Sequence, residues 1–257
     1  MSGEPAGLFA APRYDPETPW PPHLATLAVV AILLAAAVAG TLCAAVLDLV
    51  RERAPASPHG FPSAADEAVR GMVWLIGFQA AVVAGTMAAA RRLGGEPRRV
   101  LALDPPRQGL RLLLPALGIL VVASLAYAGL VLFLDRTAFL RDLGVAAALV
   151  RSEAWPLAMF AIGIGAPLSE ELLFRGFLFP AFARSRLGLT GAAVATTLGW
   201  TVLHAGYTTF GMVEVFLIGL YFCWLLVRSG SLWVPIACHA IYNTALAIAL
   251  MWLPIGL

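Results

Sequence analysis

The chain has 257 residues, of which 60% are hydrophobic and 12% are charged, and its mean hydropathy is +0.85. Ordinary soluble domains carry about 25% charged residues, so this composition excludes a soluble globular protein and indicates a polytopic membrane protein. The net charge of +2 gives no sign of nucleic-acid binding, and we expect no nucleic-acid partner. All 17 basic residues are arginine, a bias that favours a GC-rich bacterial genome.

Residues 1–22 are rich in proline and polar residues, and they lack the basic region that precedes the apolar core of a signal peptide. We therefore interpret them as a polar, proline-rich N-terminal tail and expect no cleaved signal. The three cysteines form no CxxC pair, so the sequence indicates neither a disulfide framework nor a zinc site.

The rest of the chain is a series of apolar stretches. A helix needs about 20 apolar residues to cross a bilayer core of about 30 Å. Seven stretches meet or approach this length, namely Leu24–Leu47, Gly71–Ala90, Leu112–Leu134, Trp155–Ala183, Leu187–His204, Met212–Val227 and Leu232–Leu253. Thr137–Val150 would add an eighth membrane segment if it embeds in the bilayer as a re-entrant or interfacial segment. The sequence predicts an all-α, polytopic membrane helix bundle with seven to eight transmembrane helices, grouped as 23–150 and 151–257.

Arginines in the short loops predict the orientation, because positively charged flanks stay in the cytoplasm. With the N-terminus inside, ten arginines face the cytoplasm and six face the other side. The ten are Arg13, Arg91, Arg92, Arg98, Arg99, Arg107, Arg111, Arg184, Arg186 and Arg228, and the six are Arg51, Arg53, Arg70, Arg136, Arg141 and Arg151. We expect an integral protein of the bacterial inner membrane with a cytoplasmic N-terminus.

Glu170, Glu171 and Arg175 lie in the middle of the fourth apolar stretch. An ionised residue at mid-membrane costs about 2.5 to 3.5 kcal/mol, so three of them together require a compensating role. Glu171 and Arg175 are four residues apart on one helix face and are expected to form an ion pair. Glu170 is rotated by about 100° from Glu171 and remains available for chemistry.

Other polar residues recur on the later stretches. Trp200 and His204 lie one turn apart, as do His239 and Asn243. In an antiparallel hairpin, Glu170 and His204 would lie at the same depth, about 25 Å from the turn that joins their helices. His239 would be only about 14 Å from its own turn, so its helix must be tilted or broken, or its turn must lie below the surface.

Each of these residues has a plain structural interpretation. A single histidine in an apolar helix commonly packs through a hydrogen bond, and Asn or Gln side chains often bridge helices, which is what we expect of Gln79. Two carboxylates, two histidines and an asparagine on nearby spans instead favour one shared polar cavity.

Three motifs, EExxxR, aromatic-xxx-His and HxxxN, follow each other in this order. Together they resemble the intramembrane glutamic proteases of the CAAX-protease and bacteriocin-processing family, to which the type II prenyl-protein endopeptidases belong. The resemblance covers about residues 155–250, whereas the first three spans resemble nothing specific. One departure is Trp200, where the family often has phenylalanine.

The resemblance implies a role for each motif residue. Glu170 would be the general base that activates a water, and His204 would hold and polarise that water. His239 and Asn243 would donate hydrogen bonds to the oxyanion of the tetrahedral intermediate. Glu171, Arg175 and Trp200 would shape the site, and no cofactor or metal would be needed beside the catalytic water.

Alternatives remain open. HExxH is absent, but Glu170, His204 and His239 could in principle ligate a metal. The cavity could also belong to a non-catalytic immunity or scaffold protein, or to a proton-coupled transporter, although no repeat of the spans is evident. For a protease, the expected partner within the lipid bilayer is a membrane-anchored peptide or protein, such as a leader, a pheromone precursor or the anchor of a sorted surface protein. The sequence does not indicate an oligomeric state.

Overall fold

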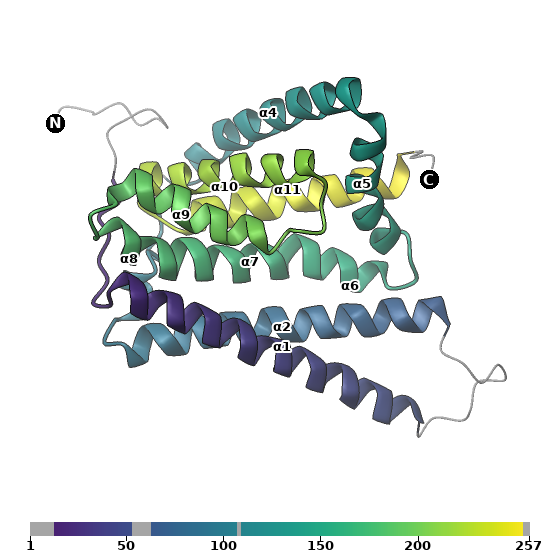
Figure 1. Cartoon of the computed structure of the whole chain (residues 1–257), viewed down its shortest axis with the longest axis horizontal. Coiled ribbons are helices and arrows are strands. Elements are labelled where there is room, and N and C mark those ends of the chain that lie inside the picture. Colours follow the sequence, from purple (N-terminus) through teal and green to yellow (C-terminus); the bar gives the residue numbers. More distant parts are fainter. Residues whose placement is uncertain (1–12, 53–62, 107–108, 254–257) are drawn as a thin grey trace.

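A computed structural model describes residues 13–52, 63–106 and 109–253. Residues 1–12 of the predicted tail, together with Arg53 and Arg107 of the arginine count, lie outside the described residues. Within the described ranges, helices are the sole regular secondary structure, which confirms the predicted all-α class (Figure 1).

The first group of helices begins with a long antiparallel pair and ends with a helix that lies across the bundle (Figure 1). That last helix, α5, contains the predicted eighth segment, and its 15 residues are too few to cross a bilayer. The elements are α1 (Pro22–Glu52), α2 (Ala64–Arg92), α3 (Pro97–Val100), the 3-10 turn η1 (Gly109–Leu112), α4 (Leu113–Leu134) and α5 (Arg136–Val150).

The second group is built on one long helix at residues 155–183, which changes its winding along its length. Its parts are α6 (Trp155–Phe160), η2 (Ala161–Gly165), α7 (Ala166–Glu170), η3 (Glu171–Leu178) and α8 (Phe179–Ala183). Three helices follow, namely α9 (Gly188–Val202), α10 (Thr209–Ser229) and α11 (Trp233–Trp252).

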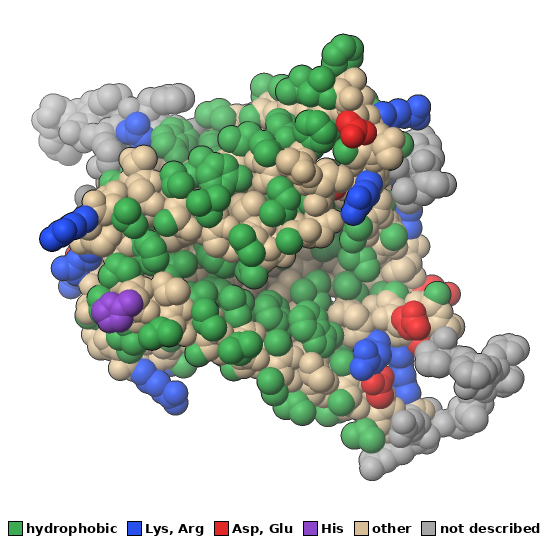
Figure 2. All heavy atoms as spheres, in the orientation of Figure 1, with side chains coloured by type: hydrophobic (Ala, Val, Ile, Leu, Met, Phe, Trp, Pro, Cys, Tyr) green, Lys and Arg blue, Asp and Glu red, His purple; other side chains and the backbone are tan. Residues whose placement is uncertain are grey.

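Six of these helices are long and apolar enough to cross a membrane, as far as the described residues extend. The predicted span Leu187–His204 is the exception, because α9 has only 15 residues and ends near the middle of the bundle (Figure 1). Hydrophobic side chains cover the middle of the molecular face in Figure 2, and charged ones gather at its two ends. This distribution is that of an integral membrane protein.

Two segments of the long helix, η2 and η3, are π-helical. The Ala166 N–H donates to Ala161, five residues back, as a π-helix requires. Amide side chains from the two sides of the helix bind the same segment. Gln79 of α2 donates to the Ala161 carbonyl at 3.1 Å, and Asn243 of α11 donates to the Ile162 carbonyl at 3.2 Å. Gln79 therefore bridges two helices, as expected.

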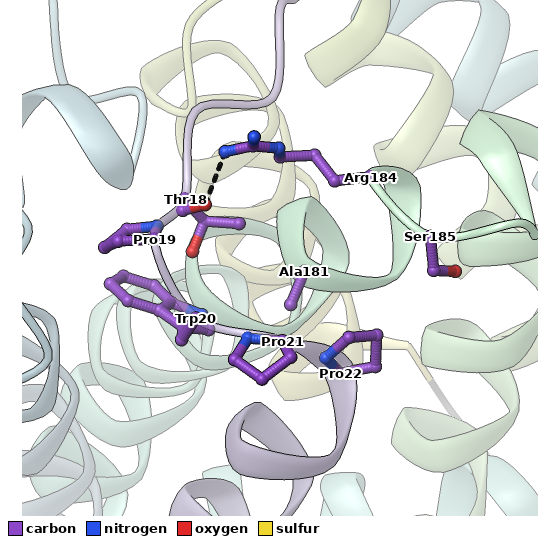
Figure 3. A pocket seen from close by; sticks show the side chains of 8 residues that line it. All are labelled: Thr18, Pro19, Trp20, Pro21, Pro22, Ala181, Arg184 and Ser185. Atoms are coloured by element: carbon purple, nitrogen blue, oxygen red, sulfur yellow. Dashed lines mark hydrogen bonds between the residues drawn. The ribbon is translucent and has the colours of Figure 1, made fainter.

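The described end of the N-terminal tail lies across the far end of the long helix (Figure 3). Arg184 donates to the Thr18 carbonyl at 2.6 Å, and the Trp20 indole N–H donates to the Phe177 carbonyl at 3.3 Å. The Trp20 and Phe177 rings stack with centroids 4.6 Å apart. These contacts hold the start of α1 against η3 and α8, and so fix the helix that carries the charged residues.

The turn between α10 and α11 is buried beneath residues 101–104. Ser231 is 1% exposed and donates its hydroxyl to the Asp104 carbonyl at 2.6 Å, while the Leu232 N–H donates to Ala102 at 2.8 Å. The turn therefore lies below the surface of the bundle.

Candidate active site

Glu171 and Arg175 form the expected ion pair, and both side chains are 0% exposed. One guanidinium nitrogen of Arg175 lies 3.2 Å from Oε1 of Glu171, and the other donates to the Gly219 carbonyl of α10 at 3.1 Å. The guanidinium carbon also lies 4.4 Å from the centre of the Trp200 ring. Burying two charges costs several kcal/mol per ion, and this set of contacts offsets part of that cost, since Oε2 of Glu171 and Nε of Arg175 have no hydrogen-bond partner among the described residues.

Glu171 also contacts His239, which lies on α11. Nδ1 of His239 is 3.0 Å from the same Oε1 atom that binds Arg175. The imidazole ring stacks on Phe222 with centroids 4.7 Å apart, so its plane is fixed as well. Because Nδ1 faces a carboxylate, the nitrogen of His239 left for chemistry is Nε2.

Trp200 lies at the centre of the cluster and is 3% exposed. Its indole N–H donates to Oε2 of Glu170 at 2.7 Å. Trp200 thus uses one carboxylate oxygen of Glu170 and does not bind the other, Oε1. The Trp200 ring meets His204 edge-on with centroids 4.9 Å apart and His239 with centroids 6.1 Å apart. One aromatic side chain thus joins the carboxylate to both imidazoles.

His204 lies just beyond the end of α9 and is partly buried. Its Nδ1 is 3.0 Å from the Trp200 carbonyl. A carbonyl oxygen only accepts hydrogen bonds, so Nδ1 carries the proton, and Nε2 of a neutral ring is an acceptor. This arrangement leaves His204 able to accept a hydrogen bond from a water.

Asn243 is placed differently from the other six predicted residues. Its side-chain amide donates to the Ile162 carbonyl of η2, and within the described part of the chain it makes no side-chain hydrogen bond to those six residues. One of its two amide hydrogens is thus used to hold the π-helical segment, and the other remains available.

Two residues of the cluster could not be identified as site residues from the sequence. Phe222 stacks on His239, and Gly219 provides the carbonyl that binds Arg175. A Cβ atom on Gly219 would lie 2.5 Å from Thr197, 2.8 Å from Trp200 and 2.9 Å from Arg175. The glycine therefore allows α10 to approach α9 and η3 closely. Neither residue stands out by sequence, since glycine and phenylalanine are ordinary in apolar helices.

The described residues contain no group of three His, Cys, Asp or Glu side chains that could hold a metal ion. The pocket in Figure 3, lined by residues 18–22, Ala181, Arg184 and Ser185, lies near the end of α8. Ala181 is roughly 16 Å along the helix from Glu170, so we do not assign this pocket to the site. The fold and the polar cluster define a polytopic membrane protein with buried ionisable groups.

Comparison with known proteins finds a family model that is similar to the part of the chain that carries this cluster. Residues 152–245 match the family model described as Type II CAAX prenyl endopeptidase Rce1-like. The chain therefore contains an Rce1-like domain, which supports its membership of the CAAX-protease and bacteriocin-processing family and confirms the resemblance found in the sequence. That family model describes a type II CAAX prenyl endopeptidase, and it matches about a third of the chain.

Sequence comparison also finds a relative of this chain. An Escherichia coli protein, described as an uncharacterized 24.3 kDa protein, is 38% identical over 86 residues. The match covers 32% of this chain and 39% of that protein, so the chain spans well under half the length of this relative. No solved structure matches the chain significantly.

Proposed function

We propose that the protein is an intramembrane glutamic endopeptidase, which hydrolyses a peptide bond in a membrane-anchored peptide or protein. The observation that carries this proposal is the position of Trp200, which binds Glu170 and contacts both His204 and His239. A carboxylate on α7, an imidazole from the turn after α9 and an imidazole on α11 are thereby held in one cluster. The Rce1-like domain supports the same class of reaction.

The proposed reaction begins with a water between Glu170 and His204. Glu170 takes a proton from this water as its oxygen attacks the carbonyl carbon of the scissile bond, and Nε2 of His204 accepts the second hydrogen in a hydrogen bond. The proton on Glu170 then passes to the leaving amine nitrogen as the carbon–nitrogen bond breaks. No nucleophilic side chain and no metal take part in these steps.

The developing oxyanion requires hydrogen-bond donors. We assign this role to Nε2–H of His239 and to the second amide hydrogen of Asn243. Because Nδ1 of His239 faces Glu171, Nε2 is the nitrogen that can face the oxyanion, and it donates when the ring carries protons on both nitrogens. Glu171 thus acts through His239, while Arg175 holds Glu171 in place.

The substrate is proposed from the surroundings of the site. The cluster lies within helices that are long and apolar enough to cross a membrane, so a substrate must reach it within or along the bilayer. A peptide with an apolar anchor meets this requirement. The arginine count further supports a cytoplasmic N-terminus in a bacterial inner membrane.

Glu170→Gln tests the proposed function. Gln keeps an oxygen that can accept the Trp200 N–H, so folding and expression should be preserved while the base is lost. Cleavage of a fluorogenic membrane peptide by the purified protein is expected to fall by about 10² to 10⁴-fold. Turnover of the variant at the wild-type rate would refute the assignment of Glu170 as the base. Comparative membrane proteomics of cells with wild type or this variant would then identify the uncut precursor.

A further inference from the structure

The turn at residues 203–208, between α9 and α10, carries a second aromatic residue next to His204. Within this turn the His204 N–H donates to Thr201 at 2.8 Å, and the Tyr207 N–H donates to the His204 carbonyl at 3.1 Å. The backbone thus folds back on itself and brings the Tyr207 ring over the His204 ring. The two rings are nearly parallel, with an interplanar angle of 8° and centroids 6.1 Å apart.

Tyr207 is the outermost member of a row of side chains in contact with one another. Arg175 lies against Trp200, Trp200 against His204, and His204 against Tyr207. The exposed fraction rises from 0% at Arg175 to 37% at Tyr207. The molecular face in Figure 2 is hollowed near the point where α9 ends and this turn begins. Tyr207 therefore forms the accessible end of the cluster.

The Tyr207 hydroxyl is available as a hydrogen-bond donor. It has no hydrogen-bond partner among the described residues, whereas the hydroxyls of Tyr127 and Tyr221 donate to backbone carbonyls. Burial against its neighbours, and after it the carboxylate of Glu170, raise the pKa of the Tyr207 phenol above its usual value. The phenol therefore keeps its proton at neutral pH, and it lies within the electrostatic reach of Glu170.

The turn is anchored by a residue from outside the family match. Asp142 of α5 accepts hydrogen bonds from the Thr208 N–H at 2.7 Å and from the Thr208 hydroxyl at 2.5 Å. Thr208 in turn caps the N-terminus of α10 by accepting from the Gly211 N–H. The first group of helices thus fixes the position of Tyr207 through Asp142.

We propose that Tyr207 is a substrate-binding residue of the site, which donates its hydroxyl hydrogen bond to a backbone carbonyl of the bound peptide and packs its ring along the peptide over His204. This inference rests on the proposed endopeptidase function, in which the bound chain extends past Glu170 and His204. Asp142 is a positioning residue in this arrangement, because it acts through the turn and does not reach the substrate.

Tyr207→Phe tests the proposal, because it keeps the ring stacked on His204 and removes only the hydroxyl. A lost hydrogen bond in binding is expected to raise KM by about 3- to 10-fold and to leave kcat and thermal stability nearly unchanged. Tyr221→Phe is the matched control, since it removes a hydroxyl that donates to Ala116, and its KM should equal that of wild type. A fall in kcat with unchanged KM, or no change in either constant, would overturn the substrate-binding role.

Binding without cleavage separates this inference from the proposed function. A fluorescently labelled form of the same membrane peptide is titrated into Glu170→Gln and into Glu170→Gln with Tyr207→Phe. Weaker binding by the double variant supports the role of Tyr207, and equal Kd values overturn it. If Glu170→Gln still cleaves the peptide, the proposed base fails, and the KM values of wild type and Tyr207→Phe then decide the role of Tyr207.

A double-mutant cycle tests the positioning role of Asp142. Asp142→Asn weakens the anchor of the turn and is expected to raise KM in the wild-type background. In the Tyr207→Phe background the same substitution should have a much smaller effect on KM, because the hydrogen bond that it positions is already absent. Equal effects in the two backgrounds would show that Asp142 does not act through Tyr207.

Discussion

Glu171 and His239 meet across two helices, with Nδ1 of the imidazole 3.0 Å from Oε1 of the carboxylate. The same oxygen binds Arg175, so one atom joins a cation on its own helix to an imidazole on α11. The relationship gives the second glutamate of the EExxxR motif a role beyond neutralising the arginine. It fixes the orientation of a histidine that the proposed reaction requires.

Glu171→Gln should therefore reduce both stability and activity. The substitution leaves the charge of Arg175 buried without its partner, and breaking a buried pair in this way costs about 3 to 5 kcal/mol. It also removes the carboxylate that orients His239. We expect a lower thermal unfolding temperature in detergent, together with reduced cleavage of the fluorogenic peptide.

Asp48→Asn is the control for this prediction, because Asp48 pairs with Arg70 at 2.9 Å where both side chains are well exposed. Exposed pairs contribute about 1 kcal/mol or less, so this variant should unfold and cleave like wild type. A Glu171→Gln variant with unchanged thermal stability and a purely catalytic loss would contradict the structural role assigned to the pair.

The membrane helices and the local pairing of the charged residues could be predicted from sequence because they depend on short-range physics. Apolar length alone locates the long helix that carries Glu170. The spacing of four residues is enough to predict the ion pair between Glu171 and Arg175. The contact between Glu171 and His239 could not be predicted, since it joins residues 68 positions apart and depends on how α11 packs.

The remaining differences also arise from tertiary contacts. The α-helical period does not reveal η2 and η3. Gln79 and Asn243 donate to carbonyls of η2, and the Trp20 indole donates to a carbonyl of η3. The predicted span Leu187–His204 exceeds α9 by Leu187, Leu203 and His204, because hydropathy does not show where the backbone leaves the helix and turns. The role of Asn243 as an oxyanion donor stays a prediction.

Trp200→Phe separates the two contributions of the central aromatic residue. Phenylalanine keeps a ring between Arg175 and His204 but loses the N–H that binds Glu170 at 2.7 Å. A hydrogen bond to a charged group contributes about 1.5 to 3 kcal/mol, so we expect kcat to fall by roughly tenfold or more as the carboxylate loses its fixed orientation. Steady-state kinetics with the fluorogenic peptide measure this effect.

The control for Trp200→Phe is Trp74→Phe. Trp74 also donates its indole N–H, to the Thr41 hydroxyl at 3.3 Å, but it does so between α1 and α2. This variant should retain the kinetic constants of wild type. If Trp200→Phe also retains them, the indole N–H does not orient the base.

Metal removal should leave the activity unchanged. In the proposed reaction, Glu170 and His204 carry out the proton transfer and water binding that a metal-bound hydroxide would otherwise supply. Incubation of the purified protein with a chelator, followed by the cleavage assay, checks this expectation. Inhibition that added zinc reverses would favour the metal site considered from Glu170, His204 and His239.

Gly219→Ala should destabilise the protein although alanine favours helices. Its Cβ atom would lie 2.5 Å from Thr197 and 2.8 Å from Trp200, and such overpacking typically costs about 1 to 3 kcal/mol, which exceeds the gain of about 1 kcal/mol in helix propensity. Displacement of Trp200 should also lower cleavage. Gly118→Ala in α4 meets nothing within 4 Å and should be neutral or slightly stabilising. Thermal unfolding of the two variants side by side decides the matter, because equal stability would show that the helices do not need the glycine for their close approach.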